Sequence, residues 1–392
     1  MRRNVSIWTL ALALTLDLAA GVGDAIGSDG TIRPGQVWPD STGVPINAHG
    51  GCVLFRDGTY YWFGTYCAEG EAGNAAQVGV QAYSSSDLVS WKNEGVVLGV
   101  SGDRESPLAR GCILERPKVI YNATTGKFVM WFHLEPLGRD YAGALSGVAV
   151  ADTVTGPYRF TGSFRPDAGV WPINAPKELQ VELNAQETER LARIRFTGGA
   201  IPDYPTDLVY RRDFKGGQMA RDMTLFVDDD KRAYQVYSSE ENGTLHVSLL
   251  TGDYLRSAGR YARILPGRFN EAPAIFKHGG KYWMVTSDCT GWAPNAARLS
   301  VADSVWGPWT EIGNPWVGEK RHTNASYESQ SAFFFGVAGG SDRVIYVADR
   351  WRPENPIDAR YIWLPVDFER SGRPYLQWRD AWDPGLRAHA GP

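Results

Sequence analysis

The sequence is poor in the residues that build metal centres and disulfide scaffolds. Its 392 residues include four cysteines and six histidines, and no two cysteines form the CxxC pair of many zinc sites. We therefore expect no metal site and no cofactor. In an exported protein, the four cysteines allow one or two disulfides with three possible pairings, among which the sequence does not choose. They are Cys52, Cys67, Cys112 and Cys289.

The chain also lacks an excess of charge of one sign. It carries 40 Lys and Arg against 44 Asp and Glu, a formal net charge of -4, and it has no concentrated basic cluster. Nucleic acids and anionic membrane surfaces both require such a basic face. Neither is therefore an expected partner, and we expect a monomer.

Long hydrophobic runs are missing after the N-terminus. At the N-terminus itself, Arg2 and Arg3 precede an apolar run over residues 7–16 and then small residues, the pattern of a secretory signal peptide. The run is too short to cross a bilayer. We expect residues 1–25 to be removed and the protein to be secreted and extracellular.

Turn-forming and aromatic residues are abundant, with 44 Gly, 23 Pro, 15 Trp and 18 Tyr. This combination is typical of β structure built from short strands. Five segments share one order, in which a polar residue precedes an apolar strand, a turn and an aromatic-rich strand. A hairpin-like unit follows each of them. The five segments are residues 49–66, 115–133, 221–240, 270–292 and 329–351.

Five copies of a four-stranded unit predict an all-β, five-bladed β-propeller, because each blade needs its neighbours to bury its apolar faces. A β-sandwich is the alternative, but it gives no reason for five repeats. The long gap between the second and third copies predicts an insertion at about 165–213, with a short amphipathic helix at 185–195. We assign one propeller domain to residues 30–382 and a C-terminal tail to 383–392.

Each predicted blade begins with a polar side chain. The first strand of a propeller blade lines the central channel, so these five side chains should meet at one mouth of the channel. Carboxylates that converge repel one another and lose water, which raises some of their pKa values. Glu271 is thereby predicted to be a general acid, as glycoside hydrolysis requires. The five entry residues are His49, Glu115, Asp222, Glu271 and Gln330.

Structural roles are the open alternatives for these residues taken singly. Glu271 precedes Ala-Pro and is suited to capping a strand. Asp222 is suited to an ion pair with Arg221 or Arg350. His49 fits a hydrogen-bonded structural histidine, or a residue that holds a water or a cation.

Two tryptophans that follow inner strands, Trp292 and Trp351, have the shape to stack on a sugar face. Packing within the propeller explains each of them equally well.

Several ordered motifs resemble glycoside hydrolase family 43 and, within it, the exo-β-1,3-galactanase branch. They are INAHGG, DGTYYWFG, ERPKVIYN, ARDMTLFVDDD, YSSE, NEAPAIFK, TSDCTGW and SQSAFF, and they run from about residue 46 to 366. The resemblance implies a five-bladed propeller and an exo-acting, inverting hydrolase. Such an enzyme would release galactose from β-1,3-linked galactan, for example arabinogalactan side chains.

The resemblance also implies individual roles. Glu271 in NEAP would be the acid, Asp222 in RDM the modulator of its pKa, and Gln330 in SQS the base. Glu115 in ERPK would bind sugar hydroxyls or assist electrostatically. The residues expected to bind substrate are Glu115, His49, Tyr141, Thr290, Trp292 and Trp351.

Two departures from the family pattern affect the chemistry. The first entry, NAHGG, has no aspartate to serve as the usual base; the galactanase branch shares this absence and is thought to use a glutamine instead. An amide can act as a base only through its imidic acid tautomer. Otherwise it only positions the water, and another group takes the proton. Second, Thr65 stands where the branch commonly carries glutamate, with Glu69 and Glu71 close by as possible substitutes.

Two other functions stay open. One is a different family 43-type glycosidase, an arabinofuranosidase or a galactofuranosidase. The other is a non-catalytic carbohydrate-binding propeller, which Thr65 and the missing aspartate favour. The presence of both Glu271 and Asp222 opposes that reading.

Overall fold

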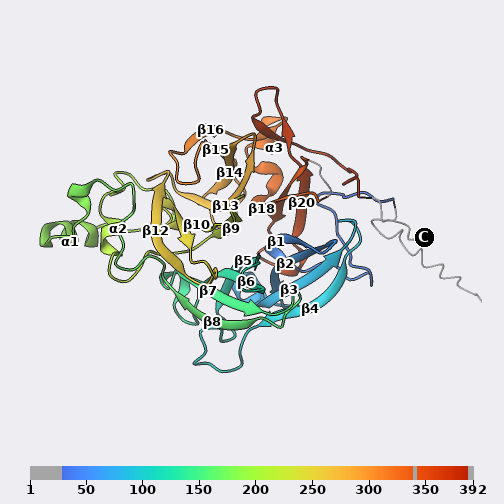
Figure 1. Ribbon diagram of the computed structural model, residues 1–392, viewed down its shortest axis with the longest axis horizontal. Helices are drawn as coiled ribbons and strands as arrows, with labels where there is room; N and C mark the ends of the chain where they lie inside the picture. Colours follow the sequence, from blue (N-terminus) through green and yellow to red (C-terminus); the bar gives the residue numbers. More distant parts are fainter. Residues whose placement is uncertain (1–28, 339–341, 387–392) are drawn as a thin grey trace, which may run out of the picture.

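The structure, a computed structural model, describes residues 29–338 and 342–386. The predicted signal segment at 1–25 lies outside these residues, and the predicted tail is described only as far as residue 386. The described chain forms six hydrogen-bonded sheets, five of which contribute their first strands to a common centre (Figure 1). No helix within the described ranges is both long and apolar enough to cross a membrane.

The first two sheets follow the chain in order, and every pair of neighbouring strands in them is antiparallel. Each sheet corresponds to one repeat of the sequence. The first contains β1 (His49–Arg56), β2 (Thr59–Cys67), β3 (Gln77–Ser85) and β4 (Lys92–Gly99); the second contains β5 (Ile113–Asn122), β6 (Lys127–Glu135), β7 (Leu145–Ala151) and β8 (Arg159–Phe164).

Three further sheets correspond to the remaining repeats and are again antiparallel. The last of them has three strands. Their strands are β9 (Met223–Val227), β10 (Ala233–Ser239), β11 (Thr244–Leu250) and β12 (Ser257–Ile264); β13 (Asn270–His278), β14 (Lys281–Asp288), β15 (Arg298–Ala302) and β16 (Thr310–Gly313); and β18 (Gln330–Gly336), β19 (Val344–Arg350) and β20 (Arg360–Pro365).

A sixth sheet makes the predicted count of five blades wrong: counted by its sheets, the propeller is six-bladed. This sheet lies beside β20, whereas β1, β5, β9, β13 and β18 contact one another in a ring. Its strands lie outside the five repeated segments and are too short to show an alternating pattern. They are β17 (Trp316–Val317), β21 (Asp367–Phe368) and β22 (Pro374–Gln377), with β17 parallel to β22.

The chain between β8 and β9 leaves the sheets and carries two helices, α1 (Ala185–Ala192) and α2 (Val209–Arg212), at the left of Figure 1. Helix α1 confirms the predicted helix, although it ends earlier. It begins after Asn184, whose side chain accepts a hydrogen bond from the Glu187 amide while the Glu187 carboxylate accepts one from the Asn184 amide. This capping box explains why the helix starts there. Within the described residues, the remaining helical segments are α3 (Lys320–Thr323) and five 3₁₀ turns, Gly73–Ala76, Asp140–Ala142, Lys177–Leu179, Ser326–Glu328 and Pro356–Asp358.

The core consists of apolar clusters between neighbouring sheets. The largest cluster joins the first sheet region to the fifth through four tryptophans. The Trp363 ring centroid lies 4.6 Å from that of Trp62, 5.7 Å from that of Trp91 and 5.2 Å from that of Trp38. These contacts close the ring of sheets and hold the entry strands at its centre.

All four cysteines are free thiols. Cys52, Cys67 and Cys112 are buried and Cys289 is partly exposed. Burial raises the pKa of the Cys52 thiol to about 11, so this cysteine behaves as a small apolar core residue. The structure pairs none of the cysteines, and the disulfide expected for an exported chain is not formed.

Candidate active site

The innermost strands turn sharply just after the predicted entry residues. In β1, β5 and β13, the next residue has a positive φ: 60° at Gly50, 55° at Arg116 and 51° at Ala272. The register of each of these strands then shifts against its neighbour. A bulge with a left-handed residue bends the strand and re-aims the adjacent side chain. The bulges therefore turn three entry residues toward the axis.

A cavity of about 670 Å³ opens at this end of the axis. All nine predicted site residues line it, although they come from five different sheets and their connecting loops. The structure thus brings every one of them to a single hollow, while the role of each stays a prediction. They are His49, Glu115, Tyr141, Asp222, Glu271, Thr290, Trp292, Gln330 and Trp351.

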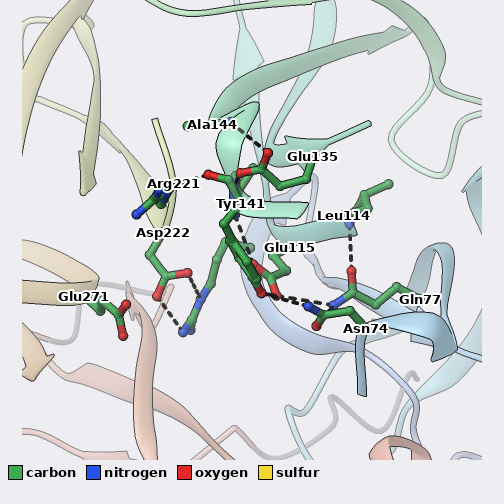
Figure 2. A network of polar contacts seen from close by, with 12 residues as sticks. Asn74, Gln77, Leu114, Glu115, Glu135, Tyr141, Ala144, Arg221, Asp222 and Glu271 are labelled. Carbon is green, nitrogen blue, oxygen red and sulfur yellow. Dashed lines mark hydrogen bonds and ion pairs between the residues drawn. The ribbon is translucent and has the colours of Figure 1, made fainter. Parts of the chain in front are cut away.

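The Glu271 carboxyl group is partly buried and lies beside Asp222 (Figure 2). Burial and the negative charge of Asp222 raise the pKa of Glu271 to about 8, so this carboxyl group holds its proton at neutral pH. The Asn242 side-chain amide donates a hydrogen bond of 2.8 Å to Glu271 Oε1. The other oxygen, Oε2, is therefore the better position for the acidic proton.

The ion partner of Asp222 is Arg116, not Arg221 or Arg350. Arg116 Nε lies 3.1 Å from Asp222 Oδ1 and Nη2 lies 2.9 Å from Oδ2, which is a two-pronged, charge-assisted contact. Burial alone would raise the pKa of Asp222, but Arg116 lowers it below its usual value. Asp222 therefore stays ionised next to a protonated Glu271.

The orientation of the Gln330 amide is set by its neighbours. Its Oε1 accepts hydrogen bonds from Arg116 Nη2 at 2.6 Å and from Trp351 Nε1 at 2.8 Å. Arg116 and Trp351 can only donate, so the atom facing them must be the oxygen. The amide nitrogen donates to the Ser287 hydroxyl at 2.9 Å.

A chain of polar contacts holds Glu115. Its Oε2 lies 3.0 Å from His133 Nδ1. Its Oε1 accepts a hydrogen bond from the Tyr141 hydroxyl at 3.1 Å (Figure 2). The second nitrogen of His133 lies 2.9 Å from the buried carboxylate of Glu135. Burial opposes the charge of His133, but the two glutamates raise its pKa to about 9. The protonated imidazole fixes both carboxylates.

One trio of side chains has the composition of a metal site: donor atoms of Glu115, His133 and Asp222 lie within 4.8 Å of one another. Its chemistry does not fit one, however. Both His133 nitrogens face glutamates, and Asp222 already pairs with Arg116. We therefore assign no metal to this trio.

His49 is almost fully buried, and its Nδ1 lies 3.3 Å from the Tyr361 hydroxyl. Burial lowers the pKa of His49 to about 4, so the ring is neutral at the cavity floor. This contact matches the hydrogen-bonded structural histidine among the alternatives for this position.

The aromatic residues lie at the cavity mouth. Trp292 and Trp351 meet edge to face with ring centroids 5.6 Å apart, and Trp292 and Tyr141 are 39% and 40% exposed. Exposed rings beside a hollow are suited to sugar faces. The hydroxyl of Thr290 already donates to the Ala293 carbonyl at 2.6 Å.

Thr65 lines the cavity, but its hydroxyl donates to the Leu114 carbonyl at 3.1 Å. The nearby carboxylates that were candidate substitutes, Glu69 and Glu71, are exposed and do not belong to the cavity lining. Glu71 instead lies 3.7 Å from Arg110.

Sequence reasoning missed four groups that the cavity contains: Arg116, His133, Asn242 and the segment 196–199. Arg116 adjoins Glu115 in the ERPK motif, and the need of a buried aspartate for a counter-charge was a usable signal. No comparable signal marked Asn242 or the segment, because both reach the site from other parts of the chain.

A carboxylic acid that keeps its proton beside an ionised carboxylate is an arrangement suited to cleaving a glycosidic bond. Together with aromatic rings at the mouth of an axial hollow, it defines a glycoside hydrolase type of site. The profile of Glycosyl hydrolases family 43 matches residues 205–379. A solved structure of this family is 46% identical over 90% of this chain, which shows that the chain belongs to glycoside hydrolase family 43.

Solved structures of this family match over most of the chain. A family 43 β-1,3-galactosidase solved with galactodeoxynojirimycin is 46% identical, with a TM-score of 0.82, and the match covers 90% of this chain and 100% of that one. An exo-β-1,3-galactanase from Phanerochaete chrysosporium, solved with β-1,3-galactotriose, is 31% identical, with a TM-score of 0.71 and coverage of 91% and 69%. An exo-β-1,3-galactanase from Clostridium thermocellum is 30% identical, with a TM-score of 0.69 and coverage of 90% and 66%. No curated protein matches the sequence.

Proposed function

We propose that this family 43 glycoside hydrolase is an exo-acting, inverting enzyme that releases galactose from β-1,3-linked galactan. The observation that carries the proposal is the protonated Glu271 beside the Arg116–Asp222 ion pair in a cavity at the propeller axis. The substrate is inferred from the three relatives, whose names give β-1,3-galactosidase or exo-β-1,3-galactanase activity.

In the proposed reaction, Glu271 gives its proton to the glycosidic oxygen as the bond from that oxygen to the anomeric carbon breaks. A water oxygen forms a new bond to the same carbon from the opposite face, and one proton of that water passes to bulk water. Solvent then returns a proton to Glu271. Asp222 supports the first step because its negative charge keeps Glu271 protonated until the transfer.

We assign Gln330 to the face from which the water attacks. In the imidic acid tautomer, the oxygen of this side chain would carry a hydrogen that points at Arg116 and Trp351, which are both donors. These contacts support an amide that positions the water. The Glu115 carboxylate and the Tyr141 hydroxyl, 3.1 Å apart, are assigned to the hydroxyl groups of the bound galactose.

We also propose that the protein is secreted, on the strength of the signal-like residues 1–25, and, as a separate proposal, that it is a monomer. N-terminal sequencing of the exported protein should find a start near residue 26, and size-exclusion chromatography should give about 40 kDa, the mass of one chain without this segment. An intact N-terminus in the medium would contradict the removal of residues 1–25. A larger species would contradict the monomer.

The Glu271→Gln variant tests the proposed function. It keeps the shape of the side chain and removes the proton, so turnover of β-1,3-galactobiose should fall by about 100- to 10,000-fold. Galactose release is measured by chromatography, and galactose affinity by calorimetry. Glu69→Gln, an exposed carboxylate outside the cavity, is the matched control and should keep full activity. Equal residual rates in wild type and Glu271→Gln, with galactose still bound, would indicate a binding propeller instead.

A further inference from the structure

A segment of the excursion between β8 and β9 forms one wall of the cavity. Residues 196–199 belong to the cavity lining, although they lie far along the chain from every entry strand. The excursion is otherwise a helical appendage at the side of the propeller (Figure 1). Its contact with the cavity raises the question of which part of a substrate it would meet.

The position of Glu271 indicates which part of a substrate the segment would meet. Asn242 Nδ2 donates to Glu271 Oε1 at 2.8 Å and also lies 3.4 Å from the Gly198 carbonyl oxygen. One amide therefore links the acid to the segment. Since a general acid protonates the leaving oxygen, the leaving sugar must lie on the acid's side of the broken bond. The segment is next to that position, and the proposed mechanism assigns Gln330 to the opposite face.

The segment is held in place by aromatic and ionic contacts. The Phe196 ring meets Tyr204 edge to face at 6.4 Å, and the Arg212 guanidinium lies 5.8 Å from the Phe196 centroid. Arg212 in turn pairs with Glu241 at 2.9 Å, and Glu241 pairs with Arg221 at 3.1 Å. This series of contacts connects Phe196 to the loop that carries Asn242.

The far side of the segment meets the loop after β14. A Cβ placed on Gly199 would lie 3.3 Å from the Cys289 carbonyl oxygen, so backbone closes against backbone here. Phe196 and Trp292 both line the cavity, and the segments that meet here contribute small residues to the same lining, among them Gly199 and Gly291.

We infer that residues 196–199 form the subsite for the leaving sugar, with Phe196 as its apolar platform. The ligand is the β-linked galactose residue that becomes the new chain end after cleavage. The inference rests on the proposed function and adds to it a role for the excursion. It assigns to Phe196 a contact that matters only when the leaving group is a sugar.

The test compares two substrates that differ in the leaving group. β-1,3-Galactobiose places a sugar in this subsite. The leaving group of β-galactosyl fluoride is a single fluoride ion, so this substrate occupies only the galactose position. For Phe196→Ala, kcat/KM on galactobiose should fall by about 10-fold, the loss expected for one aromatic contact. On the fluoride it should stay within about twofold of wild type. Phe196→Tyr, which keeps the ring, should restore the rate on galactobiose.

Controls keep the outcomes separate. Val181 belongs to the same excursion, has a half-exposed side chain and does not line the cavity. Val181→Ala should therefore alter neither rate. Thermal unfolding of every variant checks the fold. If Phe196→Ala lowers kcat/KM equally on both substrates, or does not lower it on galactobiose, the subsite is overturned. Galactose release by the wild type would still support the proposed function in that case. A wild type that releases galactose from neither substrate would overturn the proposed function, and the subsite with it.

Discussion

At the scale of single residues, the site depends on one positive charge serving two acceptors. Arg116 contacts both the Asp222 carboxylate and the Gln330 carbonyl oxygen. It keeps Asp222 ionised, and the ionised Asp222 in turn raises the pKa of Glu271. Neighbouring carboxylates in one cavity thereby hold different protonation states, which is the condition for acid catalysis.

This electrostatic coupling predicts the pH dependence of turnover. Glu271 must be protonated to act, so kcat should fall as pH rises through about 8, the raised pKa of this group. In Asp222→Asn the neighbouring negative charge is gone, so the pKa of Glu271 falls and the alkaline limb moves to lower pH. The measurement is a pH profile of kcat with β-1,3-galactobiose. Asp303→Asn, at an exposed residue paired with Lys281, should leave the limb in place. An unmoved limb in Asp222→Asn would contradict the coupling.

Gln330 permits a second prediction at this scale. Gln330→Ala removes the group proposed to position the water but leaves the proposed galactose contacts of Glu115 and Tyr141, so kcat should fall by at least about 100-fold. The dissociation constant of galactose should change by less than about 10-fold, since one lost polar contact is worth about 1 kcal/mol. Turnover close to that of wild type would remove the amide from the mechanism.

At the scale of elements, the innermost hairpins combine bulges with very close backbone packing. The bulges aim the entry side chains, and glycine lets β1 approach β2. A Cβ on Gly51 would lie 1.7 Å from the Phe63 carbonyl oxygen. No side chain fits there without displacing a strand that lines the cavity.

Gly51→Ala should therefore destabilise the protein by more than about 3 kcal/mol, at the upper end of overpacking costs. Chemical denaturation monitored by tryptophan fluorescence measures this change. The matched variant is Gly99→Ala at the end of β4, where an added Cβ meets nothing within 4 Å, and its stability should match wild type within about 0.5 kcal/mol. Similar midpoints for the two variants would show that the hairpin is less constrained than its geometry indicates.

At the scale of the whole molecule, the ring of sheets is closed by buried tryptophans and by the two ends of the described chain. The Ile32 and Trp382 backbones exchange two hydrogen bonds, of 2.9 and 3.0 Å. The Trp382 indole donates to the Trp363 carbonyl at 2.8 Å. Because the entry residues come from all around the ring, this closure determines whether they meet.

Trp363→Ala tests that closure. The ring of Trp363 is fully buried, so its removal should cost about 3–5 kcal/mol and lower the unfolding temperature. Val317→Ala in β17, at a half-exposed side chain, should change stability by less than about 0.5 kcal/mol. Differential scanning calorimetry compares the two variants. A small loss for Trp363→Ala would mean that the sheets stay closed without the tryptophan cluster.

The patterns that the sequence alone revealed are those written in consecutive residues. Alternating apolar strands, turn residues and the repeated polar entries were sufficient to predict an all-β propeller and to bring Glu271, Asp222 and Gln330 to one hollow. The family 43 motifs are also continuous stretches, so the family was predictable. The helix at 185–192 was predictable as well, because its amphipathic pattern and its cap are local.

Folding in three dimensions settled what no continuous stretch contains. The sixth sheet forms because β17 meets β22 across some sixty residues of chain, and its strands are too short for periodicity to detect. Arg116 rather than Arg221 pairs with Asp222 because a left-handed turn after Glu115 redirects the chain. Phe196 reaches the cavity through contacts made by Tyr204 and Arg212. Each of these outcomes depends on which distant side chains come within a few ångströms, and that distance exists only once the ring of sheets has closed.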